Sequence, residues 1–214
     1  MPEDPYSDPV TGVLYNKLGL RSAAALEAAE REITHAALIL LDESPASASY
    51  DLAHLREIHQ RIFGDIYQWA GQVRTVAIAK SAMFCLPQYI ESSAAVIFRE
   101  LRDEDCLRGL DRGIFVGRLA YYLGEVNALH PFREGNGRAQ RAFLGQLARD
   151  AGFPLAWQHL DPVRNVEASA AIMRGDPEPM RKMRRAERGD LQAPATMGWF
   201  GSRLPSPGRH HHLT

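Results

Sequence analysis

The chain has 214 residues, 45 % of them hydrophobic and 24 % charged, a composition typical of one globular domain with a sizeable core. Its 25 lysines and arginines nearly balance 26 acidic residues, which argues against nucleic-acid or membrane binding through bulk positive charge. No apolar run approaches the ~20 residues needed to cross a bilayer, and the acidic N-terminus does not resemble a secretory signal. With only two cysteines, a reduced, cytoplasmic protein is expected.

The first half of the chain predicts two helices joined by a loop. Ser22 is a suitable N-cap for a helix that reaches about residue 41, with apolar residues recurring on one face. Asp51 can cap a second helix, which places Leu55 and Ile58 toward the core and ends near Gly64. We therefore expect these two helices to pack through their apolar faces.

Only one segment is typical of β-structure. It comprises Val73, Arg74, Thr75, Val76, Ala77 and Ile78, and residues 83–86 could pair with it as a hairpin. Two short strands cannot form a core of their own, so we expect a flap attached to a helical bundle.

Further helices are predicted toward the C-terminus. Pro87 suits the first turn of a third helix, and Asp111 opens a fourth with apolar residues from Phe115 to Leu129. A fifth is expected over residues 136–150, and another from Asp161 to about residue 174. The fold class is therefore all-α, a compact helical bundle with a short β-hairpin flap. The remainder, residues 175–214, predicts a short basic helix and a flexible tail.

The chemically informative residues, 130–141, lie between the fourth and fifth helices. Pro131 ends the preceding helix, which places His130 at a helix-to-loop edge. The turn Gly135, Asn136 and Gly137 stands where the next helix begins, and the N–H groups of a helix N-terminus bind anions. Glycines in such a turn allow a close backbone approach. These features predict an anion site beside a histidine.

Charged side chains around this turn extend the prediction. Arg138 and Arg141 are three residues apart, so they share a helix face and can reach the same phosphate. Two arginines at the positive end of a helix dipole are unfavourable unless an anion is bound. Glu134 is placed to hold Mg²⁺, and His130 is placed to act as a general base. Each feature alone is common in helix ends and turns, but together they predict phosphoryl or nucleotidyl transfer to a hydroxyl.

Residues 130–141 match His-x-Phe-x-(Asp/Glu)-Gly-Asn-Gly-Arg-x-x-Arg at every fixed position, and the chain is identified by this resemblance as a member of the Fic domain family. The resemblance covers about residues 6–173, and it sets a Fic domain at 1–174. It implies a Fic-type helical fold and AMP transfer from Mg-ATP to a protein hydroxyl.

The resemblance also assigns roles. It makes His130 the base, Glu134 the Mg²⁺ ligand, and Arg138 and Arg141 the ligands of the β- and γ-phosphates. Gly135, Asn136 and Gly137 form the anion hole, and the flap at 73–78 docks the target as an added strand.

Alternatives within the family remain. Both glycines of the turn are present, which favours AMP transfer over the kinase chemistry of relatives that carry Lys at the second glycine. UMP transfer and a non-catalytic nucleotide- or partner-binding module are the other readings, and retention of His130 argues against the latter.

The family's inhibitory pattern, (Ser/Thr)-x-x-x-Glu-(Gly/Asn), does not occur in the sequence. The chain therefore resembles the toxin of a toxin–antitoxin pair, in which a small antitoxin protein would supply a glutamate to Arg141. By family analogy the target could be the ATPase subunits of type II topoisomerases. We expect no direct nucleic-acid partner and no membrane partner.

Overall fold

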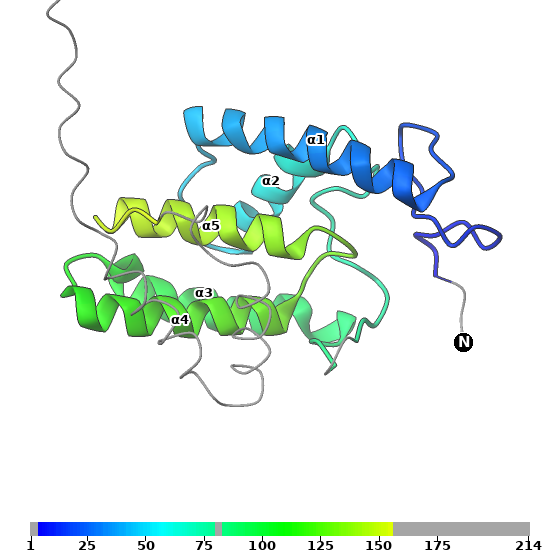
Figure 1. The fold of residues 1–214 in the computed structure, drawn as a ribbon. Helices are drawn as coiled ribbons and strands as arrows, with labels where there is room; N and C mark the ends of the chain where they lie inside the picture. Colours follow the sequence, from blue (N-terminus) through cyan, green and yellow to red (C-terminus); the bar gives the residue numbers. More distant parts are fainter. Residues whose placement is uncertain (1–3, 80–82, 156–214) are drawn as a thin grey trace, which may run out of the picture.

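The computed structural model describes residues 4–79 and 83–155, which contain five α-helices (Figure 1). The predicted all-α bundle is confirmed for this part of the chain. The predicted helix from Asp161, the end of the Fic domain near residue 174 and the basic segment at 175–214 lie outside the described residues. The elements are α1 (Ala23–Glu43), α2 (Leu52–Phe63), α3 (Ile90–Asp103), α4 (Arg112–Leu129) and α5 (Asn136–Asp150), with 3-10 turns η1 (Pro87–Tyr89) and η2 (Asp105–Leu107).

Side-chain caps fix the starts of three helices, as predicted. The Ser22 hydroxyl accepts the N–H of Ala25 at the start of α1, and the Asp51 carboxylate accepts the N–H of His54 at the start of α2. Asp111 accepts two backbone N–H groups at the start of α4. Each cap satisfies backbone donors that have no partner within the first helical turn.

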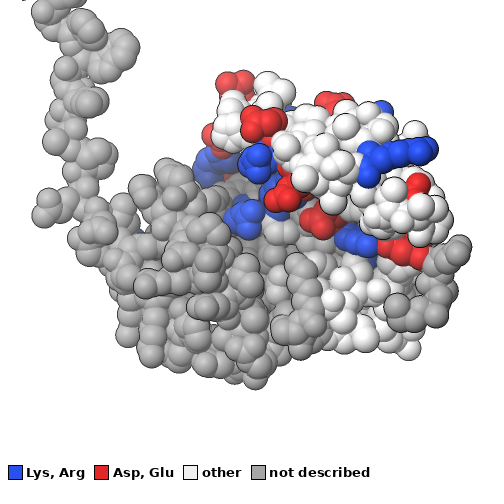
Figure 2. All heavy atoms as spheres, turned by 45° about the vertical axis from the view of Figure 1, so that its right-hand side comes forward, with Lys and Arg blue, Asp and Glu red and all other residues white. Residues whose placement is uncertain are grey.

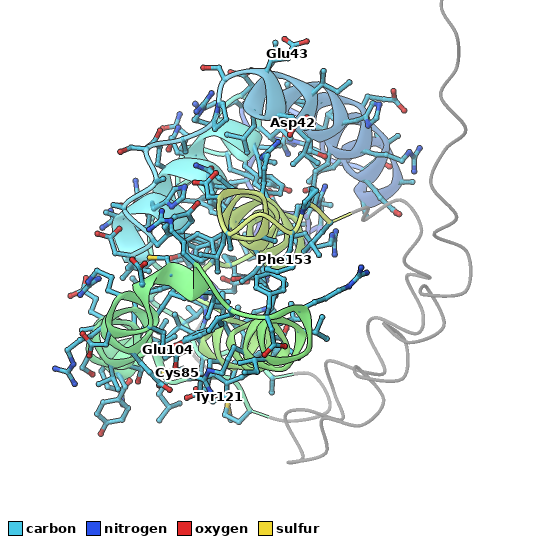
Figure 3. The ribbon with its side chains drawn as sticks, turned by 90° about the vertical axis from the view of Figure 1, so that its left-hand side faces the viewer. Asp42, Glu43, Cys85, Glu104, Tyr121 and Phe153 are labelled. Atoms are coloured by element: carbon cyan, nitrogen blue, oxygen red, sulfur yellow. The ribbon has the colours of Figure 1, made fainter. Side chains whose placement is uncertain are left out.

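Helix α5 is the central element of the bundle and lies between α1 and α4 (Figure 1). Its Phe143 is fully buried, with ring centroids 5.8 Å from Tyr50 and 5.5 Å from Phe98. Beyond α5, Phe153 (labelled in Figure 3) turns back toward the bundle. Its ring stacks on that of Phe115 of α4, with centroids 4.3 Å apart. The helix that carries the signature arginines is therefore fixed along its whole length by the core.

The two strands of the predicted β-hairpin flap are not formed in the described residues, where an antiparallel bridge joins Ala79 and Met83 and the N–H of Phe84 donates to the Ile78 carbonyl at 3.2 Å. The reason is the side chain of Arg74, which donates to the carbonyls of Val76 and Cys85. The N–H of Cys85 in turn bonds to the carbonyl of Ala128 in α4, at 3.0 Å. The carbonyl and the N–H of Cys85, which a hairpin would have used to pair its two strands, are thus bound to the Arg74 side chain and to α4.

None of the helices in the described ranges is long and apolar enough to cross a membrane. On the face shown in Figure 2, acidic and basic side chains are interspersed over the described part of the surface. This mixing agrees with the formal net charge of −1.

Candidate active site

His130 ends α4 in a left-handed conformation, with φ 44° and ψ 60°. Its ring is mostly buried and stacks on Phe84, with centroids 3.7 Å apart and planes within 9°. Nδ1 lies 3.3 Å from the carbonyl oxygen of Asn127, so a proton on Nδ1 bonds there and Nε2 becomes the basic nitrogen. The predicted base is therefore held by its own helix end and by a side chain from the segment that was predicted to pair with residues 73–78.

The signature loop is closed by the side chain of Asn136. Its Oδ1 accepts the N–H of Phe132 at 2.9 Å, and its Nδ2 donates to the Phe132 carbonyl at 2.7 Å. Phe132 itself is fully buried. The Asn136 side chain is thus a structural bridge, which leaves the backbone N–H of this residue for the predicted anion site.

Gly135 must be glycine for two reasons. Its φ is 81°, and a Cβ at this position would come within 2.3 Å of the Phe63 ring. The N–H of Gly135 donates to the Glu134 carboxylate at 2.8 Å. The N–H groups of Asn136 and Gly137 have no hydrogen-bond partner among the described residues, as befits the first turn of α5. The structure therefore places two open donors at a positive helix end.

Arg138 is held by α1. Its guanidinium forms an ion pair with Glu30, donates to the Thr34 hydroxyl at 3.1 Å, and lies 4.8 Å above the Phe63 ring. Glu30 also accepts the hydroxyl of Tyr67 and is mostly buried. The charge of Arg138 is therefore already compensated within the protein.

Arg141 differs from Arg138, because it forms no ion pair or hydrogen bond within residues 4–79 and 83–155. Its guanidinium lies next to Gly137, with Nη1 3.4 Å from where a Cβ would stand. Burial, reinforced by the neighbouring positive charge of Arg138, lowers the pKa of Arg141. An unpaired, partly buried cation beside open N–H groups is a strong site for an anion.

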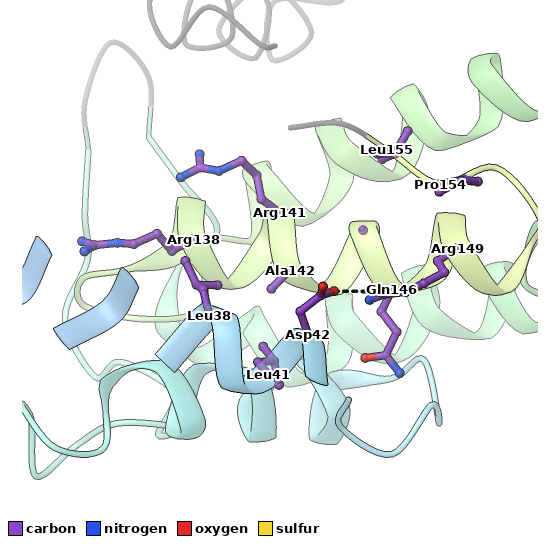
Figure 4. A pocket seen from close by; sticks show the side chains of 11 residues that line it. Leu38, Leu41, Asp42, Arg138, Arg141, Ala142, Gln146, Arg149, Pro154 and Leu155 are labelled. Atoms are coloured by element: carbon purple, nitrogen blue, oxygen red, sulfur yellow. Dashed lines mark hydrogen bonds and ion pairs between the residues drawn. The ribbon is translucent and has the colours of Figure 1, made fainter. Parts of the chain in front are cut away.

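A groove between α1 and α5 opens beside Arg141, with a volume of about 310 Å³ (Figure 4). Arg138, Arg141 and Arg149 of α5 point along its edge, and Asp42 of α1 pairs with Arg149 at the far end. The lining is completed by Leu38, Leu41, Ala142, Gly145, Gln146, Pro154 and Leu155.

Glu134 is half-exposed at the start of the turn. Its Oε1 accepts the N–H of Gly135 and lies 3.8 Å from Arg138, whereas Oε2 has no partner in the described part of the chain. No group of three or more His, Cys, Asp or Glu residues that could hold a metal ion occurs among the described residues. A single open carboxylate oxygen suits Mg²⁺ that arrives with substrate phosphates, because Mg²⁺ is commonly held by one or two carboxylates plus the phosphates.

In the flap, which is predicted to dock a target, the side chain of Arg74 is bound within the protein. The side chain is 1 % exposed, and burial lowers its pKa. Its Nε donates to the His130 carbonyl at 2.8 Å, and its backbone N–H donates to the Pro131 carbonyl at 2.9 Å. The next N–H, of Thr75, is taken by the Tyr6 hydroxyl. Arg74 therefore anchors the loop that carries the base, which leaves Val76, Ala77 and Ile78 for the predicted contact with a target.

Three residues outside the signature contribute to the site and were not predicted. Glu30 could have been found, because it interrupts the apolar face of α1 one turn after Leu26. His59 could have been found in a similar way, because it is a histidine next to the core residue Ile58 on α2. Its ring packs against Phe132 of the signature loop. For Phe84, which stacks on the base, the sequence carries no comparable signal.

Comparison with known proteins agrees with this geometry. Residues 49–148 match the Fic/DOC family. The chain is 44 % identical over 178 residues to the protein adenylyltransferase VbhT of Bartonella schoenbuchensis. The aligned region covers 83 % of this chain and 37 % of VbhT. It is 39 % identical to the Escherichia coli K12 protein named "Probable protein adenylyltransferase Fic", over 81 % of this chain and 86 % of that one.

Among solved structures, the N-terminal Fic domain of a VirB-translocated Bep effector from Bartonella quintana, with bound ADP, superposes with a TM-score of 0.77. The identity is 26 %, over 83 % of this chain and 91 % of that domain. The signature, the helical fold and these similarities lead to one assignment: the chain belongs to the Fic/DOC family.

Proposed function

We propose that this Fic/DOC protein is a protein adenylyltransferase that moves AMP from ATP to a hydroxyl of another protein. The observation that carries the proposal is that His130 ends α4 five residues before Gly135, the N-cap of α5, where an anion site is formed. That site consists of the N–H groups of Asn136 and Gly137 and of Arg141, which have no hydrogen-bond or ion-pair partner among the described residues. The relatives named protein adenylyltransferases support the same activity. The alignment with one of them, from Escherichia coli K12, covers 86 % of the length of that protein.

The reaction follows from the roles of these groups. Nε2 of His130 takes the proton from a serine, threonine or tyrosine hydroxyl, and the hydroxyl oxygen bonds to the α-phosphorus. The bond from that phosphorus to the bridging oxygen breaks, and pyrophosphate leaves. The N–H groups of Asn136 and Gly137 stabilise the charge that develops on the α-phosphate, and Arg141 binds the outer phosphates. The ion pair with Glu30 leaves Arg138 a smaller part in phosphate binding than Arg141.

We infer that Glu134 holds Mg²⁺ through its open oxygen. When bound, the ion supplies positive charge to the phosphate oxygens. The two cysteines, Cys85 and Cys106, are unpaired, and the co-substrate is ATP; both facts support a cytoplasmic site of action.

We propose further that a small antitoxin protein controls the activity through the groove between α1 and α5. The groove has an apolar floor that includes Leu38 and Leu41, and it opens directly beside Arg141. A helix with apolar residues on one face and a glutamate at the Arg141 end would fill it. The glutamate would then take the cation that the outer phosphates of ATP require.

The activity is tested by incubating the purified chain with an acceptor and ATP labelled at either the α- or the γ-phosphate. Bacterial lysate is the first acceptor, and a purified type II topoisomerase ATPase subunit is the second. We expect label on protein from the α position alone, reduced about 10²–10⁴-fold in His130→Ala while ATP binding persists.

Label from the γ position alone would establish kinase chemistry instead. Labelling from UTP in preference to ATP would establish UMP transfer, and ATP binding without any labelled acceptor would favour a binding module.

A further inference from the structure

His59 lies on α2, fully buried, and takes no part in the reaction described above. Its ring stacks between two aromatic side chains, with centroids 3.8 Å from Phe132 and 4.7 Å from Phe63. Phe132 belongs to the signature loop, and Phe63 packs directly against Gly135. The imidazole is therefore in contact with the side chains that shape the loop.

Both ring nitrogens of His59 bond to backbone groups, and the two groups come from different segments. Nδ1 accepts the N–H of Gly71 at 2.8 Å, and Nε2 lies 2.9 Å from the carbonyl oxygen of Glu134. Because an N–H only donates and a carbonyl only accepts, both bonds form together only in the neutral ring with its proton on Nε2. The chemistry of the two partners thus selects one tautomer.

The Gly71 end of this connection is fixed by α2 as well. Nε of Arg56 donates to the Gly71 carbonyl at 2.7 Å. Gly71 has φ 73°, and a Cβ there would lie 3.0 Å from both the Arg56 carbonyl oxygen and Cβ of Gln60. Arg74, three residues later, donates to the carbonyl of His130. The chain between Gly71 and Arg74 therefore connects the His59 ring to the residue that carries the catalytic base.

We propose that His59 is a positioning residue for AMP transfer, an inference that rests on the function proposed above. Its Nε2–H fixes the Glu134 carbonyl, and so sets the direction of the following N–H groups and of the Glu134 carboxylate. Its Nδ1 ties the base of the flap to the same ring. One neutral side chain thereby fixes the position of the anion site relative to the flap. Catalysis requires that supporting residues hold the reacting groups in a precise geometry.

Three substitutions separate the parts of this role. Glutamine has an amide nitrogen as many bonds from Cα as Nε2, so His59→Gln keeps the donor to Glu134. Asparagine has an oxygen as many bonds from Cα as Nδ1, so His59→Asn keeps the acceptor for Gly71. His59→Phe keeps only the stacking between Phe63 and Phe132.

The kinetics of AMP transfer distinguish these variants. We expect His59→Phe to lower kcat about ten- to a hundred-fold, with a smaller change in KM for ATP, because Arg141 still binds the phosphates. His59→Gln should recover most of kcat, and His59→Asn should recover less. The matched control is His54→Phe, which removes another buried histidine of α2, one bonded to Gln146 of α5 at 3.3 Å. It should keep the wild-type kcat.

Equal kcat in His59→Phe and wild type, or equal recovery by asparagine and glutamine, would overturn the proposal. If His59→Phe does not fold, the comparison of glutamine with asparagine decides.

A second readout needs no activity. In the nitrogen-15 NMR spectrum of the wild-type chain near neutral pH, the His59 ring should show the neutral tautomer protonated on Nε2. A proton on Nδ1, or a charged ring, would refute the two-bond arrangement whatever the enzyme does. Conversely, a wild-type chain with the expected tautomer that transfers no AMP would refute the proposed function alone.

Discussion

Arg138 and Arg141 leave the same face of α5, yet their surroundings differ in charge. Arg138 is neutralised by Glu30, whereas Arg141 has no counter-ion among the described residues. Spacing alone predicted that both would bind phosphate, because the sequence does not show that a carboxylate 108 residues away pairs with one of them. Of the two arginines, Arg141 is therefore the one whose electrostatic energy improves most when an anion binds.

We accordingly predict that Arg141→Ala weakens ATP binding about ten-fold or more, because it removes charge-assisted hydrogen bonds to the phosphates. The same substitution should weaken binding of a small inhibitory partner, because one guanidinium serves both ligands. Calorimetric titration with ATP, with and without the partner, measures both effects.

The control for this substitution is Arg99→Ala, which removes an exposed arginine of α3 and changes the net charge equally. Unchanged ATP affinity in Arg141→Ala would assign phosphate binding to other groups. An inhibitory partner that binds Arg141→Ala as tightly as wild type would exclude the proposed docking beside this residue.

At the scale of elements, α2 shapes the signature loop through close packing. Gly135→Ala places a methyl group against the buried Phe63 ring at a positive φ. We predict a loss of unfolding free energy of about 1 kcal/mol from the backbone strain and about 1–3 kcal/mol more from overpacking. ATP binding should fall too, because the open N–H groups follow directly. Chemical denaturation and ATP titration test both effects.

Gly152→Ala is the matched control for backbone strain. Gly152 has φ 87°, and nothing lies within 4 Å of where its Cβ would be. It should therefore show the strain contribution alone and retain ATP binding. Equal destabilisation by the two substitutions would mean that the loop and Phe63 move apart at no cost.

The helices could be predicted from sequence because their signals are local. Ser22, Asp51 and Asp111 cap the helices as expected, and the apolar spacing of α4 identified its buried face correctly. The hairpin prediction was wrong, because the binding of Arg74 to the carbonyls of Cys85 and His130 depends on residues 11 and 56 positions away. A run of β-branched residues predicts a strand, and the sequence alone does not show contacts with distant residues that prevent one.

In the candidate site too, some residues could be predicted from the sequence and others could not. The signature residues could be named because they are contiguous, and their spacing fixes where they lie around the start of α5. The groups that hold them, including Glu30 and His59, come from other helices. These contacts arise only when the bundle assembles, and periodicity assigns such residues merely to a buried face.

For the molecule as a whole, buried histidines make stability depend on pH. His54 is 1 % exposed, its Nδ1 has no hydrogen-bond partner among the described residues, and burial lowers its pKa. Burial likewise lowers the pKa of His59, to about 4. Below the unfolded-state pKa of about 6.5, the unfolded chain therefore binds more protons than the folded one, and stability falls as the pH falls from about 6.5 toward the folded-state values.

We predict that acidification from about pH 7.5 to about pH 5 lowers the unfolding free energy less in His54→Phe than in wild type, because one of the two titrating groups is gone. The variant will be less stable at the higher pH, since the bond to Gln146 is lost, so the test is the difference between the two pH values for each protein. Urea denaturation at both pH values measures it. His35→Gln, which removes an exposed histidine of α1, should retain the wild-type difference. A difference in His54→Phe as large as in wild type would show that His54 is protonated as readily in the folded chain as in the unfolded one, and that the acid sensitivity of the bundle has another origin.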